Sequence, residues 1–102
     1  MRTNYYFVYI LTNKRAGVFY TGVTSDLERR SWQHRTGDLR GFSQKFGLKT
    51  LVWFETHRDI HEAIAREKAI KHWRRPWKIA LIEKDNPEWR DLRDGFNKAA
   101  DA

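Results

Sequence analysis

The chain has 102 residues, and this length with an apolar content of 40% suits one domain around a single core. It has no cysteine, which excludes disulfides, thiol catalysis and cysteine-bound zinc. A net charge of +7 favours an anionic partner, with nucleic acid first and a membrane surface second. We expect one domain over residues 1–96 and a flexible tail over 97–102.

The N-terminal part of the chain predicts a β-hairpin. Residues 5–11, YYFVYIL, are apolar on both alternating faces, which indicates a central strand covered on both sides. A polar turn and a second strand over 18–23 follow, and this closeness predicts antiparallel pairing. The first run is too short to span a bilayer and no small-residue cleavage site follows it, so we expect a cytoplasmic protein that does not enter a membrane.

A helix is expected after the hairpin. Ser25 and Glu28 have the spacing of a capping box, in which the Ser25 hydroxyl accepts from the Glu28 N–H. The helix should run to about Thr36, and Gly37 should end it. The segment 37–47, GDLRGFSQKFG, then predicts a loop.

The rest of the chain predicts one more strand and further helices. A strand over 48–56 is followed by Asp59 and Glu62, which repeat the capping pattern and begin a helix that runs to about Arg75. The proline at the start of 76–84 ends that helix and suits the first turn of the next one.

Asn86 and Pro87 predict a further short helix with Trp89, Leu92 and Phe96 on one face. The order strand, strand, helix, strand, then helices predicts an α+β fold. A small three-stranded antiparallel sheet flanked by helices is its simplest arrangement.

Two tyrosines of the hairpin are candidate site residues. If the turn holds an even number of residues and no bulge intervenes, Tyr9 lies directly opposite Tyr20 and both phenols point to the same sheet face. The alternative is an aromatic pair that only fills the core. Gly22, at a strand end, indicates a bulge or the close approach of another chain.

The first helix carries a mixed stripe. Leu27, Arg30 and His34 share one side, and because Leu27 should face the sheet, the two polar residues are drawn toward it. A buried guanidinium needs an anion, so this position requires a partner carboxylate or a cleft. Alternatively Arg30 extends into solvent and His34 is an ordinary exposed residue.

Glu67 occupies a position where an apolar residue is expected. It shares a helical stripe with Ala63, Ile64 and Ile70. A carboxylate in such a stripe needs a cation or a hydrogen-bonding partner. Either it forms a salt bridge with Arg30, or it binds a divalent metal, for which magnesium is the best match.

Together these residues match the needs of phosphodiester cleavage. That reaction requires an activated water, a cation at the developing charge and usually a metal. Tyr9 or Tyr20, Arg30, His34 and Glu67 could fill those roles.

Four fragments of the sequence carry a family resemblance. FVYIL, then YTG, then DLERRSWQH, then AREKAIKHW resemble the GIY-YIG nuclease domain, in particular its small stand-alone bacterial members. The match runs from about Tyr5 to Glu83. The resemblance implies a three-stranded antiparallel sheet flanked by helices, DNA strand cleavage and one divalent metal, with magnesium first and manganese as the alternative.

The resemblance also implies a role for each site residue. Tyr9 and Tyr20 correspond to the tyrosines of the two motifs, Arg30 to the catalytic arginine, His34 to the histidine one turn later and Glu67 to the metal-binding glutamate. In that scheme a phenol relays a proton from the attacking water, together with His34, while Arg30 steadies the phosphate. A phenol acts as a base at neutral pH only if positive charge lowers its pKa, which Arg30 and the metal could do.

The chain departs from the family pattern at two places. The motif spellings differ, since the first is Phe7-Val8-Tyr9 instead of Gly-Ile-Tyr and the second is Tyr20-Thr21-Gly22. Many family nucleases carry an asparagine after the glutamate, and Asn86 is the nearest candidate here.

Two segments are candidate nucleic-acid surfaces. The segment 71–78, KHWRRPWK, interleaves basic side chains, which neutralise phosphates, with indoles, which can stack on unpaired bases. Alternatively Trp73 and Trp77 are core anchors inside a solvated basic rim. The loop 37–47 either clamps a strand or binds nothing. The residues predicted to bind nucleic acid are Arg40, Lys45, Lys71, Arg74, Arg75 and Lys78.

We therefore expect a magnesium-dependent endonuclease that hydrolyses DNA phosphodiester bonds in repair or recombination. We expect a monomer that recognises branched or single-stranded DNA, or a partner protein, instead of a long DNA sequence. The alternatives are a non-catalytic nucleic-acid-binding module that keeps the fold and a protein–protein adaptor that uses the basic face.

Overall fold

The computed structural model describes residues 5–36 and 47–93. Its strands are β1 (Tyr6–Thr12), β2 (Phe19–Thr24) and β3 (Thr50–His57), and they form one antiparallel sheet in the order β2-β1-β3. The predicted α+β fold with a three-stranded antiparallel sheet is confirmed, and the apolar run is the central strand. This position explains why both faces of β1 are apolar, since each is covered.

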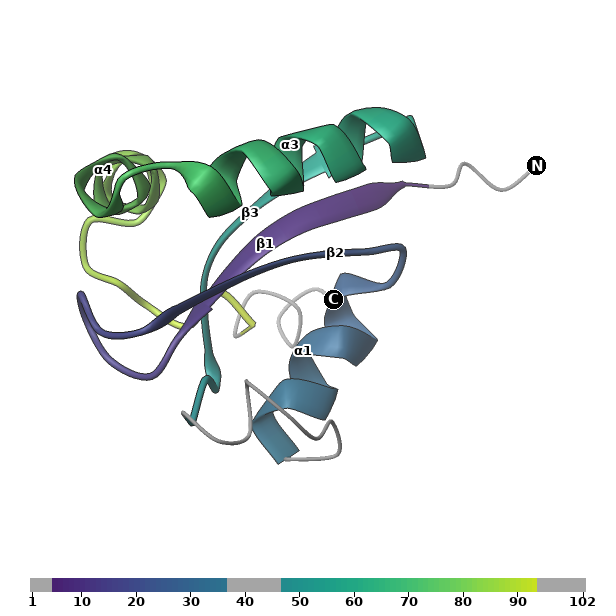
Figure 1. The fold of residues 1–102 in the computed structure, drawn as a ribbon. Coiled ribbons are helices and arrows are strands. Elements are labelled where there is room, and N and C mark those ends of the chain that lie inside the picture. The colour runs from purple at the N-terminus through teal and green to yellow at the C-terminus, as the bar shows by residue number, and fades with distance from the viewer. Residues whose placement is uncertain (1–4, 37–46, 94–102) are drawn as a thin grey trace.

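Helices cover the two faces of the sheet unequally (Figure 1). Helix α1 (Leu27–Thr36) lies on one face, and α3 (Ile60–His72) and α4 (Arg75–Asp85) lie on the other. No helix in the described segments is long and apolar enough to cross a membrane. The core on the α3 and α4 face includes Val8, Ile10, Val52, Ala63, Ile70 and Ile82. The core on the α1 face includes Tyr9, Leu11, Leu27, Leu48 and Leu51.

The register of the hairpin differs from the prediction. Tyr9 lies opposite Gly22, and Tyr20 lies opposite Leu11, so the two tyrosines are diagonal neighbours and not directly opposite residues. Residues 13–18 connect the two strands, and the first paired residues are Thr12 and Phe19. A shift of two residues preserves the alternation of side chains, so both phenols still share one sheet face.

The ends of the helices show which caps form. At α1 the capping residue is Asp26 and not Ser25, because an Oδ1 of Asp26 accepts from the N–H of Arg29 at 3.1 Å. At α3 the predicted cap is confirmed, and Asp59 accepts from the N–H of His61 at 2.8 Å. Each cap fixes where its helix begins, and therefore which residues of that helix face the sheet.

Helix α3 ends at His72, three residues before the predicted end at Arg75. A proline within a helix lacks an N–H and its ring collides with the carbonyl four residues earlier, which here belongs to His72. The chain therefore leaves the helix before Pro76, with Trp73 and Arg74 in extended conformations, and α4 begins at Arg75.

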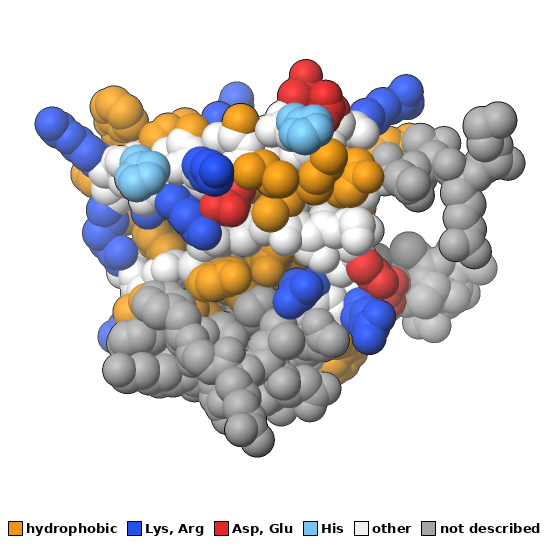
Figure 2. Space-filling view, turned by 45° about the vertical axis from the view of Figure 1, so that its right-hand side comes forward, with side chains coloured by type: hydrophobic (Ala, Val, Ile, Leu, Met, Phe, Trp, Pro, Cys, Tyr) orange, Lys and Arg blue, Asp and Glu red, His pale blue; other side chains and the backbone are white. Residues whose placement is uncertain are grey.

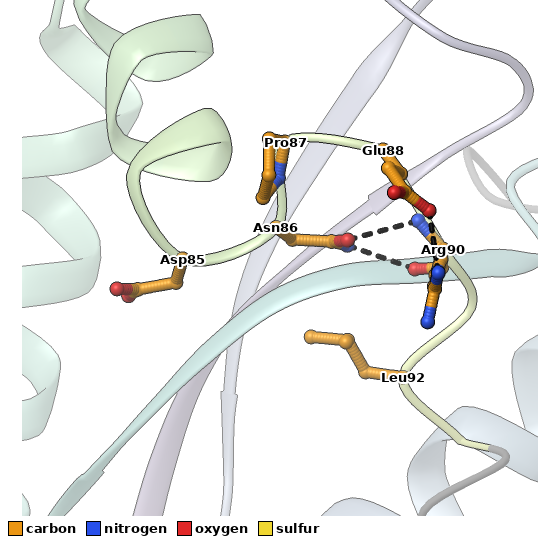
Figure 3. Close-up of a pocket in the computed structure, with 6 residues that line it drawn as sticks. All are labelled: Asp85, Asn86, Pro87, Glu88, Arg90 and Leu92. Atoms are coloured by element: carbon orange, nitrogen blue, oxygen red, sulfur yellow. Dashed lines mark hydrogen bonds and ion pairs between the residues drawn. The ribbon is translucent and has the colours of Figure 1, made fainter.

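The short helix predicted after Asn86 is absent from the described residues, in which 86–93 form turns. The Asn86 amide donates to the carbonyl of Val52. It also donates to the carbonyl of Arg90, and its oxygen accepts from the Arg90 N–H (Figure 3). Trp89 has a φ of 57°, which a helix does not allow. Asn86 is thus a buried structural residue that ties this segment to β3. Phe96, predicted on the same helix, lies outside the described residues.

Candidate active site

The two phenols predicted for the site lie together on the hairpin. The ring centroids of Tyr9 and Tyr20 are 6.1 Å apart. Gly22 lies against both rings, and a Cβ at this position would be 2.6 Å from Cζ of Tyr9 and 2.9 Å from Cε1 of Tyr20. The sequence indicated a bulge or the close approach of another chain at Gly22, but the close approach here is made by two side chains of the same hairpin. Glycine is required because any larger residue would collide with them.

Tyr9 is kept in its protonated form. Burial raises its pKa well above the ordinary value, and the neighbouring Tyr20, a hydrogen bond with Tyr20 and the charge of Glu67 act in the same direction. Arg30 opposes them without offsetting them. The charge of Arg30 does lower the pKa of Tyr9, but burial outweighs it, and the effect of a metal on the phenols stays a prediction. Arg30 and Glu67 nevertheless act on one phenol from helices that cover opposite faces of the sheet.

Arg30 is half-buried on α1, where its backbone N–H donates to the carbonyl of Asp26. Its guanidinium forms no ion pair with another described residue. The salt bridge with Glu67, left open by the sequence, is not among the ion pairs of the described residues. A half-buried guanidinium beside a pair of phenols remains suited to an external anion such as phosphate.

Glu67 is buried within the apolar stripe of α3, as its spacing predicts. It is 8% exposed, and its Oε1 lies 2.8 Å from the Nζ of Lys71 one turn later. The described residues contain no group of three or more His, Cys, Asp or Glu side chains that could hold a metal. A single carboxylate still fits magnesium, which commonly takes one or two protein carboxylates and completes its shell with water and phosphate oxygens.

A cavity of about 400 Å³ opens beside these residues, along the edge strand β2. Tyr20 contributes to its wall, with Lys71 from α3 and Lys78 from α4. The Nζ of Lys78 donates to the carbonyl of Lys71 at 3.2 Å, and burial followed by the charge of Arg75 lowers the pKa of Lys78. Two predicted nucleic-acid-binding lysines thus share one cavity with a predicted catalytic tyrosine.

The two arginines that begin α4 have different surroundings. Arg75 donates to the carbonyls of Ala16 and Gly17, the latter at 2.5 Å, and its guanidinium lies 4.5 Å from the ring centroid of Phe19. Arg75 therefore holds the hairpin connection against α4. Arg74 is exposed and is better placed to contact a phosphate.

Two residues of the cavity wall, Phe19 and Thr21, were not predicted from the sequence. They flank Tyr20 on β2, and this adjacency was the signal that could have identified them. His34 belongs to α1, but its side chain lies outside the described part of the chain, as do Arg40 and Lys45.

Comparison with known proteins gives the same class as the motifs. Residues 5–80 match the family described as the GIY-YIG catalytic domain. The chain belongs to this family, a nuclease superfamily.

Within it, the chain is similar to UPF0213 proteins, whose names assign no activity. The UPF0213 protein of Clostridium perfringens is 38% identical over 76 residues, which cover 74% of this chain and 81% of that protein. The one of Haloquadratum walsbyi is 34% identical over 80 residues, which cover 78% and 89% of the two chains. The solution NMR structure of the UPF0213 protein from Bacillus halodurans has a TM-score of 0.54 and 28% identity, over 86% of this chain and 93% of that one.

Proposed function

We propose that this chain is a divalent-metal-dependent endonuclease that hydrolyses DNA phosphodiester bonds. The observation that carries the proposal is that the charges of Arg30 and Glu67 both act on Tyr9, whose ring centroid lies 6.1 Å from that of Tyr20. A cation, a carboxylate and a phenol are groups that phosphate hydrolysis can use. Membership of a nuclease superfamily supports nucleic acid as the substrate.

The two phenols have different roles in this proposal. Tyr9 cannot contact a substrate because it is 2% exposed, and it remains protonated. Its hydrogen bond with Tyr20 orients the Tyr20 ring. Tyr20 lines the cavity and is the phenol that relays the proton of the attacking water, with His34 as the group that takes it onward. Arg30 binds the scissile phosphate and stabilises the charge that develops on it.

Glu67 is the residue that would hold the metal. Magnesium at this carboxylate, or manganese in its place, would polarise the phosphate and stabilise the leaving oxygen. Lys71 contacts the same carboxylate. If Glu67 held a metal, the Lys71 ammonium would be free to contact a neighbouring phosphate, and Lys78 and Arg74 would contact phosphates along the same surface. We place this activity in DNA repair or recombination, carried out by a cytoplasmic monomer.

One observation favours a second candidate function. The Glu67 carboxylate already has a cation beside it in Lys71, so its burial does not by itself require a metal. A non-catalytic nucleic-acid-binding module would keep this pair and the basic surface, and would bind DNA without cutting it.

Nicking of supercoiled plasmid separates the two functions. We expect nicking with magnesium or manganese and none with a chelator. Glu67→Gln should reduce nicking by about 100-fold or more while DNA binding changes little. The matched control is Glu62→Gln, an exposed carboxylate on the same helix, which should nick normally. Nicking that survives in Glu67→Gln removes Glu67 from the metal site, and binding without any nicking supports the second function.

A further inference from the structure

One indole of the chain is largely exposed next to the candidate active site. Trp77 on α4 is 60% exposed, the largest exposed fraction among the exposed large apolar side chains of the described residues. It is the residue before Lys78, which lines the cavity with Tyr20. The sequence left open whether Trp77 is a core anchor, and its exposure excludes that role.

Trp77 is held in place although it is exposed. Trp73 packs against the core, and the guanidinium of Arg66 lies 5.1 Å from the centroid of its ring. The ring of Trp77 meets Trp73 nearly at a right angle, 80° between planes and 6.4 Å between centroids. The edge-to-face contact with Trp73 limits the freedom of an indole whose remaining ring surface is open to solvent. Such preorganisation favours stacking because little freedom remains to be lost.

The charge around this indole selects the kind of partner. Between Glu67 and Glu83 the chain has five Lys or Arg residues and no Asp or Glu. Basic side chains gather on the left of Figure 2, where the end of α3 meets α4 in Figure 1. An exposed tryptophan alone also suits a protein partner, but a stretch with one sign of charge favours a polyanion that carries aromatic rings.

We propose that Trp77 stacks on an unpaired base of DNA whose neighbouring phosphates lie on Arg74 and Lys78. Bases within a duplex hide their faces from an indole, whereas an unpaired base offers one. This surface would give the chain a preference for duplexes with single-stranded extensions. The inference rests on the proposed function only in taking DNA as the ligand.

Binding measured in the presence of a chelator tests this inference without any cleavage. The probes are a blunt duplex and the same duplex with a single-stranded overhang, and the readouts are fluorescence anisotropy of the labelled DNA and quenching of tryptophan fluorescence. We expect Trp77→Ala to bind the overhang duplex about 10-fold more weakly and the blunt duplex unchanged. Trp77→Phe, which keeps an aromatic face, should recover most of the affinity.

Trp32→Ala is the matched control. Trp32 is 44% exposed on α1, across the sheet from α4, with the guanidinium of Arg93 5.2 Å from its ring centroid. The Trp32→Ala variant should bind both duplexes as the wild type does. Equal loss on both duplexes in Trp77→Ala, or no loss on either, overturns the inference. That result leaves the proposed nuclease intact if plasmid nicking still depends on Glu67, so the two failures are distinguishable.

Discussion

Replacing Gly22 by alanine should destabilise the protein through the phenol pair. The added carbon would lie 2.6 Å from both Cζ and the hydroxyl of Tyr9, and 2.9 Å from Cε1 of Tyr20. Tyr9 cannot withdraw because it is 2% exposed within a core that includes Leu11. Overpacking of this kind costs about 1–3 kcal/mol, and the stiffer unfolded chain of an alanine variant offsets roughly 0.4–1 kcal/mol. We expect a net loss of about 1–2 kcal/mol in the free energy of unfolding.

Urea denaturation of a double-mutant cycle checks the origin of this loss. The cycle consists of Gly22→Ala, Tyr9→Leu and the double variant. If the collision is with the Tyr9 ring, the double variant should lose about 1 kcal/mol less than the sum of the single losses, because the smaller side chain leaves room for the methyl group. Losses that add within about 0.5 kcal/mol would refute the collision.

Three further predictions follow from particular contacts. Asn86→Ala removes the side-chain partner of three backbone groups, one in a buried and two in part-buried hydrogen bonds, and should lower the free energy of unfolding by about 2–4 kcal/mol. A loss below about 1 kcal/mol would contradict its structural role. Arg75→Met should speed amide hydrogen exchange in the connection 13–18, whereas Arg74→Met should not, and equal exchange in both variants would contradict the clamp. Because the pKa of Tyr9 is raised, the folded chain keeps a proton that the unfolded chain releases near pH 10. The contribution of Tyr9 to the free energy of unfolding is therefore fully present below about pH 10 and falls above it. Tyr9→Phe should show a smaller alkaline loss of stability in pH-dependent urea denaturation, and an unchanged alkaline profile would contradict this reasoning.

The elements of the fold were predictable where one local pattern decided the outcome. The run 5–11 has two apolar faces, which only a covered central strand satisfies. Glu67 interrupts an apolar helical stripe, and the structure buries it there. In both cases the apolar pattern of a few neighbouring residues was enough to predict which side chains are buried.

What the sequence did not determine depends on contacts between distant segments. The register that places Tyr9 opposite Gly22 is set by the length of the connection between the strands, not by the strands themselves. Arg75 belongs to a basic run, yet it binds carbonyls that lie 58 and 59 residues earlier in the chain. Asn86 precedes a proline, which is a local helix signal, but its amide donates to a carbonyl of β3 and to a carbonyl of the following turn.

Paramagnetic broadening by Mn²⁺ tests most directly whether a carboxylate, a guanidinium and a phenol form one metal-dependent site. Manganese added in small amounts to the isotope-labelled protein should broaden the amide signals around Glu67, Tyr20 and Arg30 most strongly, while the signal of Asn86 changes least. The same titration of Glu67→Gln should lose this pattern. Broadening centred elsewhere in the chain, or an unchanged pattern in the variant, would contradict the account.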